Sequence, residues 1–205
     1  MSVANQNQIT IKRVQGSEID AYISELAQLR MTVFREYPYL YEGSLDYEKN
    51  YLRVYKESPR SALILALDGD KVVGAATALP LEDEADYVKK PFLDQGYDIQ
   101  KIYYFGESVL FSSYRGRGIG NLFFDARESA AQQAGDFRWT AFCAVNRGQQ
   151  HPLRPNSYRD LHEFWVKRGY QKNESLEAYF HWQDIGDTQE TAKPMIFWLK
   201  EWNMK

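Results

Sequence analysis

The sequence has a single cysteine, Cys143, among its 205 residues. One thiol can form neither a disulfide within the chain nor a cysteine-built zinc site, and it suits a reducing compartment. We therefore expect a cytoplasmic protein. No run of about 18 apolar residues is present, which argues against a transmembrane helix. The opening segment, MSVANQNQITIKR, has no apolar stretch of the signal-peptide kind, and we predict no membrane partner.

An excess of charge of one sign is missing as well. There are 25 basic and 28 acidic residues, giving a net charge of −3. Nucleic-acid-binding proteins usually carry a basic excess or stripe, so we predict no nucleic-acid partner. The three histidines, His151, His162 and His181, have no metal-ligand spacing, and we predict no metal site. Repeats and Pro/Gly/Ser-rich linkers are absent, which predicts one domain over residues 1–205.

Apolar residues are plentiful, at 44% hydrophobic and 15% aromatic, which is typical of a chain with a packed core. Their periodicity predicts an α/β protein of the α+β type, with a mixed sheet rather than a doubly wound nucleotide fold. We expect a hairpin turn at Asp68–Lys71, around an Asp-Gly pair, and a long polar connection over 81–100. The expected strands are 9–14, 61–67, 71–79, 102–111, 137–145, 175–182 and 194–202. The expected helices begin at Ser17, Ser44, Ile119 and Tyr158, with a C-terminal glycine cap at Gly169 for the last.

One segment carries the strongest chemical signal, Glu107-Ser-Val-Leu-Phe-Ser-Ser-Tyr-Arg-Gly-Arg-Gly-Ile-Gly120. A predicted strand runs through a glycine-rich turn into a predicted helix. Glycines allow positive φ and close approach of a ligand, and the free N–H groups of a helix N-terminus attract anions. Arg115 and Arg117 add positive charge, so the segment predicts a phosphate or pyrophosphate site.

The spacing discriminates between known phosphate-binding turns. A P-loop needs Lys-Ser/Thr where Asn121 and Leu122 stand, and the third glycine of a dinucleotide fingerprint is missing. Arg115-x-x-Gly118-x-Gly120 resembles the coenzyme A pyrophosphate loop of the GNAT N-acetyltransferase superfamily. A second family signature resembles Phe164-Trp165-Val166-Lys167-Arg168-Gly169-Tyr170, near the end of the chain.

This resemblance implies a GNAT fold: a mostly antiparallel sheet of six or seven strands, helices on both faces, and splayed fourth and fifth strands. Acetyl-CoA would place its pantetheine arm in the gap between these strands. The arm would then pair with the backbone of Val109, Leu110 and Phe111. The diphosphate would bind the N–H groups of Arg115, Gly116, Arg117, Gly118, Ile119 and Gly120, with Asn121 close behind.

The resemblance further implies acetyl transfer to a primary amine of a small molecule or a peptide N-terminus, by direct attack in a ternary complex. Glu107 is the candidate general base, because relatives often carry a carboxylate there, and Gly106 can mark a β-bulge that re-aims it. A salt bridge to a neighbouring strand is the equal alternative for Glu107. The Leu110 N–H is the candidate oxyanion donor.

The general acid departs from the family pattern. Trp165 stands where relatives have a tyrosine, and an indole N–H cannot protonate a thiolate. Tyr158 is the candidate for a direct role on the same helix. His162 is interpreted as an ordinary helix histidine and Cys143 as a small buried residue. A non-catalytic acyl-CoA-binding module of the same fold is therefore the alternative function, besides another acceptor, a longer acyl chain, or an unrelated nucleotide ligand.

The acceptor itself is left open by the sequence. Tyr37, Tyr39 and Tyr41 lie where family members form a wall of the acceptor site, although packing under a loop explains them equally. The acidic run 82–86 favours a cationic substrate, and the loop 146–157, with Arg147, His151 and Arg154, favours an anionic group or the cofactor's 3′-phosphate. Aromatic residues of the last strand are compatible with a homodimer or with core packing, namely Phe197, Trp198 and Trp202.

Overall fold

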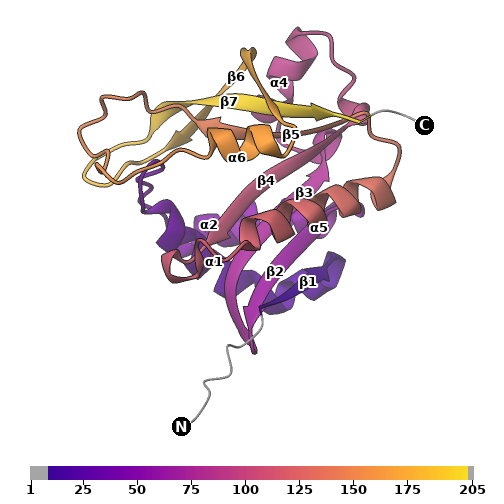
Figure 1. The fold of residues 1–205 in the computed structure, drawn as a ribbon, viewed down its shortest axis with the longest axis horizontal. Coiled ribbons are helices and arrows are strands. Elements are labelled where there is room, and N and C mark those ends of the chain that lie inside the picture. The colour runs from indigo at the N-terminus through magenta and orange to yellow at the C-terminus, as the bar shows by residue number, and fades with distance from the viewer. Residues whose placement is uncertain (1–8, 203–205) are drawn as a thin grey trace.

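The computed structural model describes residues 9–202, which form a seven-stranded sheet in the order β1-β2-β3-β4-β5-β7-β6 (Figure 1). Every neighbouring pair is antiparallel except β4 and β5, which run parallel. The expected mixed, mostly antiparallel sheet is thus confirmed. The strands are β1 (Thr10–Val14), β2 (Ala62–Asp68), β3 (Lys71–Pro80), β4 (Ile102–Leu110), β5 (Trp139–Val145), β6 (Gln171–Trp182) and β7 (Thr191–Glu201).

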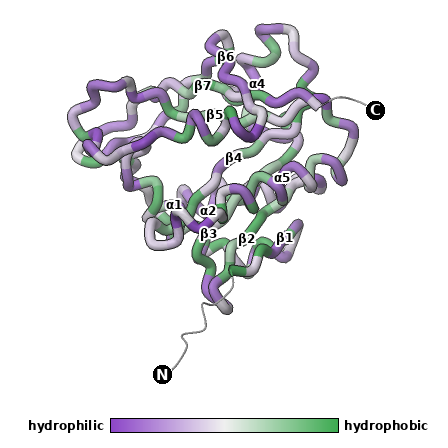
Figure 2. Tube along the Cα trace, in the orientation of Figure 1, coloured by the Kyte–Doolittle hydropathy of each residue, from purple (hydrophilic) through white to green (hydrophobic). Residues whose placement is uncertain are grey.

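Helices cover both faces of this sheet, because successive strand residues point to opposite sides. Along β4, Ile102 and Tyr104 join a core cluster with the first four α-helices, whereas Tyr103 and Phe105 join a second cluster with α5. Figure 2 shows the hydrophobic colouring of β2 and β3 between these layers. The helices are α1 (Ile23–Phe34), α2 (Leu45–Tyr51), α3 (Arg53–Glu57), α4 (Asp86–Asp94), α5 (Ile119–Ala134) and α6 (His162–Lys167). Short 3₁₀ turns are η1 (Gly16–Tyr22), η2 (Leu81–Asp83), η3 (Ile99–Lys101) and η4 (Ser112–Tyr114).

The strands β4 and β5 pair only from Ile102 to Tyr104, against Trp139 to Ala141, and then separate. A register shift between β3 and β4 follows directly, opposite Thr77, and puts Gly106 and Glu107 in a β-bulge. The Glu107 N–H donates to Thr77 Oγ1 at 3.1 Å instead of to a ladder carbonyl. Since a bulge bends its strand, it accounts for the departure of β4 from β5 (Figure 1). The expected splay and bulge are confirmed.

Several predicted boundaries were wrong. Residues 81–100 are not a plain loop, because they contain α4, whose internal Pro91 and charged residues hide the helical pattern. The first helix begins as η1, with Gln15 rather than Ser17 at its N-cap in a capping box with Glu18. The β2–β3 hairpin turn does lie at Asp68–Lys71 as expected, although its two loop residues are Gly69 and Asp70 and not an Asp-Gly pair.

The helix expected from Tyr158 begins only at His162, so Tyr158 lies in the preceding loop, where its N–H donates to Pro155 O at 3.0 Å. The end of α6 is as expected. Gly169 has φ of +88°, its N–H donates to Val166 O, and the Tyr170 N–H donates to Trp165 O, which is a Schellman cap. Ser44 caps α2 as expected, through its Oγ and the Tyr47 N–H.

Across residues 9–202 there is no helix with the length and apolar character needed to cross a membrane.

Candidate active site

The glycine-rich turn between β4 and α5 has the geometry of an anion cradle. Gly116 and Gly118 have φ of +77° and +81°, a backbone region that favours glycine, and Gly118 is the N-cap of α5. A Cβ atom at either position would meet nothing within 4 Å, so the space beside the turn is open. The first N–H groups of α5 lack intrahelical acceptors and lie at the positive end of its dipole. They can therefore bind a diphosphate.

The two arginines of the turn serve mainly to shape it. Arg115 pairs with Glu36 at 2.7 Å, and its Nε and Nη2 donate to Leu110 O at 3.3 and 3.2 Å. Arg117 donates to Ser113 O at 2.9 Å. The ion pair with Glu36 offsets part of the expected positive charge, so backbone N–H groups are the principal donors of the cradle.

Fewer residues at the end of β4 have backbone groups free to pair with a cofactor than the sequence led us to expect. The Phe111 N–H donates to Val73 O at 3.1 Å, so it belongs to the β3 ladder and cannot pair with a cofactor in the gap. The backbone N–H and C=O groups of successive residues point to alternate sides of a strand. Those of Val109 therefore point toward β3, like those of Phe111, and those of Leu110 point toward the gap. The expectation for Leu110 is compatible with this geometry, whereas those for Val109 and Phe111 require correction. The backbone groups of Ser108 point toward the gap as those of Leu110 do, and the sequence interpretation missed this residue.

Glu107 lies at the centre of a buried polar cluster, with only 9% of its surface exposed. Arg30 Nη1 lies 2.7 Å from Glu107 Oε1, and the Tyr51 hydroxyl donates to Oε2 at 2.9 Å. The sequence left a salt bridge to a neighbouring strand as the alternative role for Glu107. Glu107 does form a salt bridge, although its partner lies on α1 and not on a strand. A carboxylate has about four lone-pair positions, so these contacts leave room for a substrate proton.

A second carboxylate, Glu84, is buried close to this cluster. Burial raises the pKa of Glu84 to about 7, against the lowering effect of hydrogen bonds from the Ala85 N–H and the Tyr55 hydroxyl. Tyr55 also lies 3.1 Å from Tyr51, hydroxyl to hydroxyl. The chain thus places two carboxylates and two tyrosines in contiguous buried contact beneath Gly106.

A cavity of about 300 Å³ opens above Glu107. Tyr39 and Tyr41 line it, as expected for a wall of an acceptor site, whereas Tyr37 does not. Helices α1, α2 and α4 contribute on one side and strands β4 to β7 on the other. The lining residues are Arg30, Phe34, Tyr39, Tyr41, Tyr47, Tyr51, Tyr87, Tyr104, Gly106, Glu107, Cys143, Tyr179, Phe180, His181, Trp182 and Met195.

Tyr158 lies outside the described lining of this cavity. Its ring is edge-on to Tyr37 at 4.6 Å between centroids, and the Arg154 guanidinium lies 4.8 Å from its ring centroid. Burial raises its pKa, and Tyr37 and Asp160 add to the rise, so Tyr158 is a neutral phenol. Its direct role stays a proposal.

Cys143 is buried in the core, and Trp165 is a partly buried residue packed against it. The Trp165 ring packs within about 5 Å of Phe142 and Trp198. Burial raises the pKa of the Cys143 thiol to about 12, and its Sγ lies 3.1 Å from the Tyr104 hydroxyl. A thiol with so high a pKa is a poor nucleophile, which agrees with the expectation of a small buried residue.

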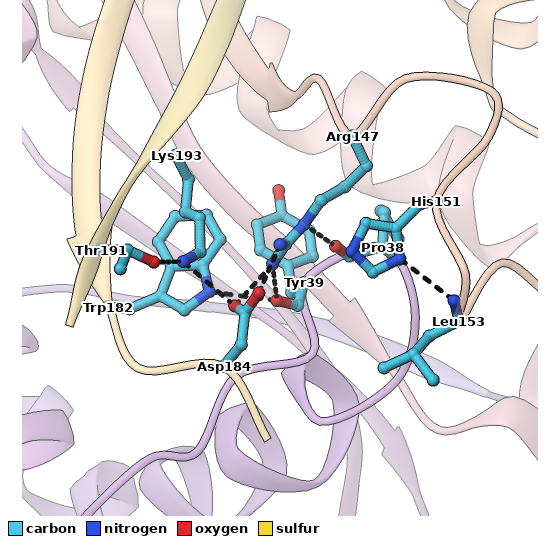
Figure 3. A network of polar contacts seen from close by, with 9 residues as sticks. All are labelled: Pro38, Tyr39, Arg147, His151, Leu153, Trp182, Asp184, Thr191 and Lys193. Carbon is cyan, nitrogen blue, oxygen red and sulfur yellow. Dashed lines mark hydrogen bonds and ion pairs between the residues drawn. The ribbon is translucent and has the colours of Figure 1, made fainter. Parts of the chain in front are cut away.

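The two charged loops turn out to be occupied by structural contacts. In the run 82–86, Glu82 pairs with Arg60, and Glu84 is buried. Figure 3 shows Arg147 held by a bidentate pair with Asp184, at 2.5 and 2.7 Å, and by the carbonyl oxygens of Pro38 and Tyr39. Although burial acts to raise it, hydrogen bonds from Arg147 keep the pKa of Asp184 below its ordinary value. Arg147 is therefore a clamp on the tyrosine loop, not a free anion-binding group.

The last strand packs inward. Phe197 and Trp198 are buried within the chain, which explains them as core residues and removes the reason to expect a homodimer from them. Over residues 9–202, no cluster of three or more His, Cys, Asp or Glu side chains could hold a metal ion.

Sequence interpretation also missed Arg30, Glu48, Tyr51 and Tyr55. A signal was available, because Arg30 follows Leu26 and precedes Phe34 at helical spacing and so puts a charge on an apolar face. A charge in such a place needs a buried partner. Its partners, Glu48 and Glu107, come from two other elements and could not be identified from the sequence.

No family model and no curated protein sequence matches this chain. Solved structures do match it. One is an assigned acetyltransferase from Salmonella typhimurium with its cofactor acetyl-CoA (TM-score 0.62, 9% identity, 97% of this chain and 96% of that one). Another is a GNAT-family acetyltransferase from Streptococcus pneumoniae (TM-score 0.56, 14% identity, 95% and 100%). A third is a ribosomal-protein-alanine N-acetyltransferase from Brucella melitensis (TM-score 0.59, 12% identity, 94% and 99%).

Proposed function

We propose that this chain, which has the fold of the GNAT acetyltransferases, transfers an acetyl group from acetyl-CoA to a primary amine of a small molecule or a peptide N-terminus. One observation carries the proposal. The gap between β4 and β5 has the glycine turn at one end and a cavity containing Glu107 at the point where the strands part. A cofactor site and an acceptor site thus meet at one carboxylate.

The residues present fit coenzyme A. The N–H groups from Gly116 to Gly120 would hold the diphosphate, with Asn121 beside them, and open space at Gly116 and Gly118 admits it. The expectation for the Arg115 N–H requires correction, because this group donates to Ser112 O at 3.2 Å. The Leu110 and Ser108 backbones would hold the pantetheine arm, as an extended chain pairs with a free strand edge. When bound, acetyl-CoA would supply a thioester, from which an ammonium acceptor would yield an amide, the free thiol and one released proton.

Three groups of the chain would then assist the acetyl transfer. Glu107 would accept the proton that an ammonium must lose before its nitrogen can attack. The Leu110 N–H, aimed into the gap, would stabilise the oxyanion. Tyr158, which packs against Tyr37, stays the candidate proton donor to the thiolate.

The cofactor site is tested by Gly118→Glu, which places a bulky negative charge in the cradle. Calorimetry should show micromolar acetyl-CoA binding to the wild type, no comparable affinity for NAD or ATP, and at least about a 100-fold loss in the variant. Gly96→Glu is the matched control, because Gly96 also has positive φ (+75°) and open surroundings but lies after α4. Equal binding by Gly118→Glu and the wild type would refute the cofactor assignment.

Glu107→Gln tests the general base. The amide keeps the size of the side chain but cannot accept the proton, so we expect kcat to fall about 100- to 10,000-fold with unchanged acetyl-CoA affinity. Thiol release and calorimetry give the two readouts. A variant with wild-type kcat would leave Glu107 as a salt-bridge residue only.

The second candidate function is a non-catalytic acyl-CoA-binding module, which the packed Trp165 favours because it removes the usual acid. Acetyl-CoA binding without turnover on any amine would support it. A cytoplasmic location and a single domain over 1–205 stay predictions.

A further inference from the structure

We infer that the acceptor is a small amine that enters the cavity as a singly charged ammonium ion on an aromatic or aliphatic body and carries no acidic group. This inference rests on the proposed function, since it names the acceptor class of the same cavity.

The walls of the cavity are aromatic to an unusual degree. Seven tyrosines, two phenylalanines and one tryptophan line its volume of about 300 Å³. Such a volume is at the small end for ligand pockets and suits a compact molecule. Burial raises the pKa values of Tyr39, Tyr41 and Tyr87, so these rings are neutral phenols. Neutral aromatic faces attract cations and give no charge to an anion.

The buried charges at the floor of the cavity are net negative once Glu48 is counted, which contacts Arg30 from outside the described lining. Arg30 pairs with both Glu48 and Glu107, so two carboxylates face one guanidinium, and the side chains of all three are at most 7% exposed. The guanidinium is also covered, with its carbon 4.0 Å from the centroid of the Tyr51 ring. Because charges interact more strongly away from water, this floor favours a cation and repels an acid.

No arginine or lysine of the described lining is left unpaired to hold a carboxylate or phosphate. Arg30 is the one arginine or lysine among the described lining residues. Behind the Trp182 ring lie Arg147 and Lys193, but Arg147 makes four hydrogen bonds to Asp184 and two carbonyl oxygens, and Lys193 donates to Thr191 (Figure 3). Besides Arg30, Glu107, the tyrosines and Cys143, the one ionisable group in the described lining is His181, which lies exposed to solvent. An acidic substrate group buried beside Glu107 would therefore meet only the already paired Arg30, which is costly.

The reaction balances with these groups. The ammonium gives one proton to the Glu107 carboxylate, and the freed nitrogen lone pair forms the C–N bond as the carbonyl oxygen becomes the oxyanion. The C–S bond then breaks. The leaving sulfur takes a proton from the candidate donor Tyr158, and the second amine proton replaces it, which leaves a neutral amide and a neutral thiol.

The test compares pairs that differ only by a carboxylate. Phenethylamine is set against phenylalanine, and 3-methylbutylamine against leucine, with acetyl-CoA and thiol-release detection. We expect kcat/KM to be at least about 100-fold higher for each amine than for its amino acid. As a test of charge, trimethylphenethylammonium should inhibit at least about 10-fold more tightly than the neutral phenethyl alcohol.

A substitution in the lining tests whether the aromatic walls cause the preference for the amine. Tyr47→Leu keeps an apolar side chain in the lining but removes one ring, and should raise KM for phenethylamine about 2- to 5-fold at unchanged acetyl-CoA affinity. Tyr22→Leu is the control, because Tyr22 lies on η1 outside the lining and should leave KM unchanged.

These experiments distinguish failure of the acceptor class from failure of the proposed function. Equal or better use of phenylalanine and leucine overturns the acceptor class while the proposed function stands. Acetyl-CoA binding without transfer to either simple amine likewise overturns the acceptor class and leaves the cofactor site intact. Failure of acetyl-CoA to bind in calorimetry, measured without any amine, overturns the proposed function itself.

Discussion

Gly106 shows how the absence of one side chain positions the groups around it. A Cβ atom there would lie 1.9 Å from the Tyr55 hydroxyl oxygen and 2.7 Å from Thr77 Oγ1. Both atoms belong to the polar contacts beneath the cavity, since Tyr55 contacts Tyr51 and Thr77 accepts the Glu107 N–H. Glycine is therefore required by close approach, and its position in the bulge is a consequence of the site.

We expect Gly106→Ala to lower the free energy of unfolding by about 1–3 kcal/mol, because Tyr55 or Thr77 must move. Urea denaturation measures this. Gly120→Ala is the control, since its Cβ would have its nearest neighbour at 3.6 Å and the residue is helical, so stability should not fall. Equal stability of the Gly106 variant and the wild type would contradict the close approach.

Glu84 makes stability depend on pH. Its pKa in the folded protein is about 7, above the ordinary value of 4.5, so the folded state holds its proton more tightly. The stabilising contribution is fully present below the unfolded pKa and is lost as pH rises through 7. The loss amounts to about 3 kcal/mol between these limits.

We therefore expect Glu84→Gln to gain stability relative to the wild type as pH rises from 5 to 8, by about 3 kcal/mol. Denaturation at several pH values measures the difference. The control Glu82→Gln alters a more exposed ion pair with Arg60 and should follow the wild-type pH trend. Parallel curves for Glu84→Gln and the wild type would mean that Glu84 keeps an ordinary pKa.

At the scale of elements, the loop that follows α1 is held by contacts from distant parts of the chain. Arg147, after β5, and Asp184, after β6, form a buried pair, and Arg147 and Trp182 both donate to Tyr39 O (Figure 3). The cavity wall formed by Tyr39 and Tyr41 thus depends on β5 and β6. Its position follows from hydrogen bonds to backbone carbonyls, which any sequence in that loop would offer.

Removing the clamp should loosen this wall. We expect Arg147→Met to cost about 3 kcal/mol of stability, because Asp184 keeps only Lys193, and to speed amide exchange at Tyr41. The control Arg138→Met breaks an exposed pair with Glu201 and should cost less than about 1 kcal/mol. Similar losses in the two variants would argue against a buried clamp.

At the scale of the whole molecule, the parting of β4 and β5 connects the two faces of the sheet. The glycine turn begins α5, which packs on one face, and the cavity lies on the other face among α1, α2 and α4 (Figure 1). A cofactor and an acceptor can therefore approach from opposite faces and meet in the gap. A continuous sheet would close this route with ladder hydrogen bonds.

Local patterns were enough for much of this fold. The succession of the strands along the chain, the start of α5 at Ile119 and the glycine cap at Gly169 follow from periodicity and glycine chemistry, which act within a few residues. The helix α4 was missed because Pro91 and its charges obscure the period. Tyr158 was predicted to lie on a helix from apolar spacing alone. Spacing cannot show that a turn at Pro155 puts the helix start several residues later.

The sequence by itself determined the glycine turn and the position of the Glu107 carboxylate near the end of β4, because each depends on residue type at a fixed spacing. The bulge at Gly106 also needed the pairing with β3 and the close approach of Tyr55. Only the tertiary structure decided that Arg30 pairs with both Glu48 and Glu107, that Arg147 is engaged by Asp184, and that Phe111 pairs with β3. These outcomes join residues from separate elements. Burial and pairing of charges depend on distances in space, which spacing along the chain does not contain.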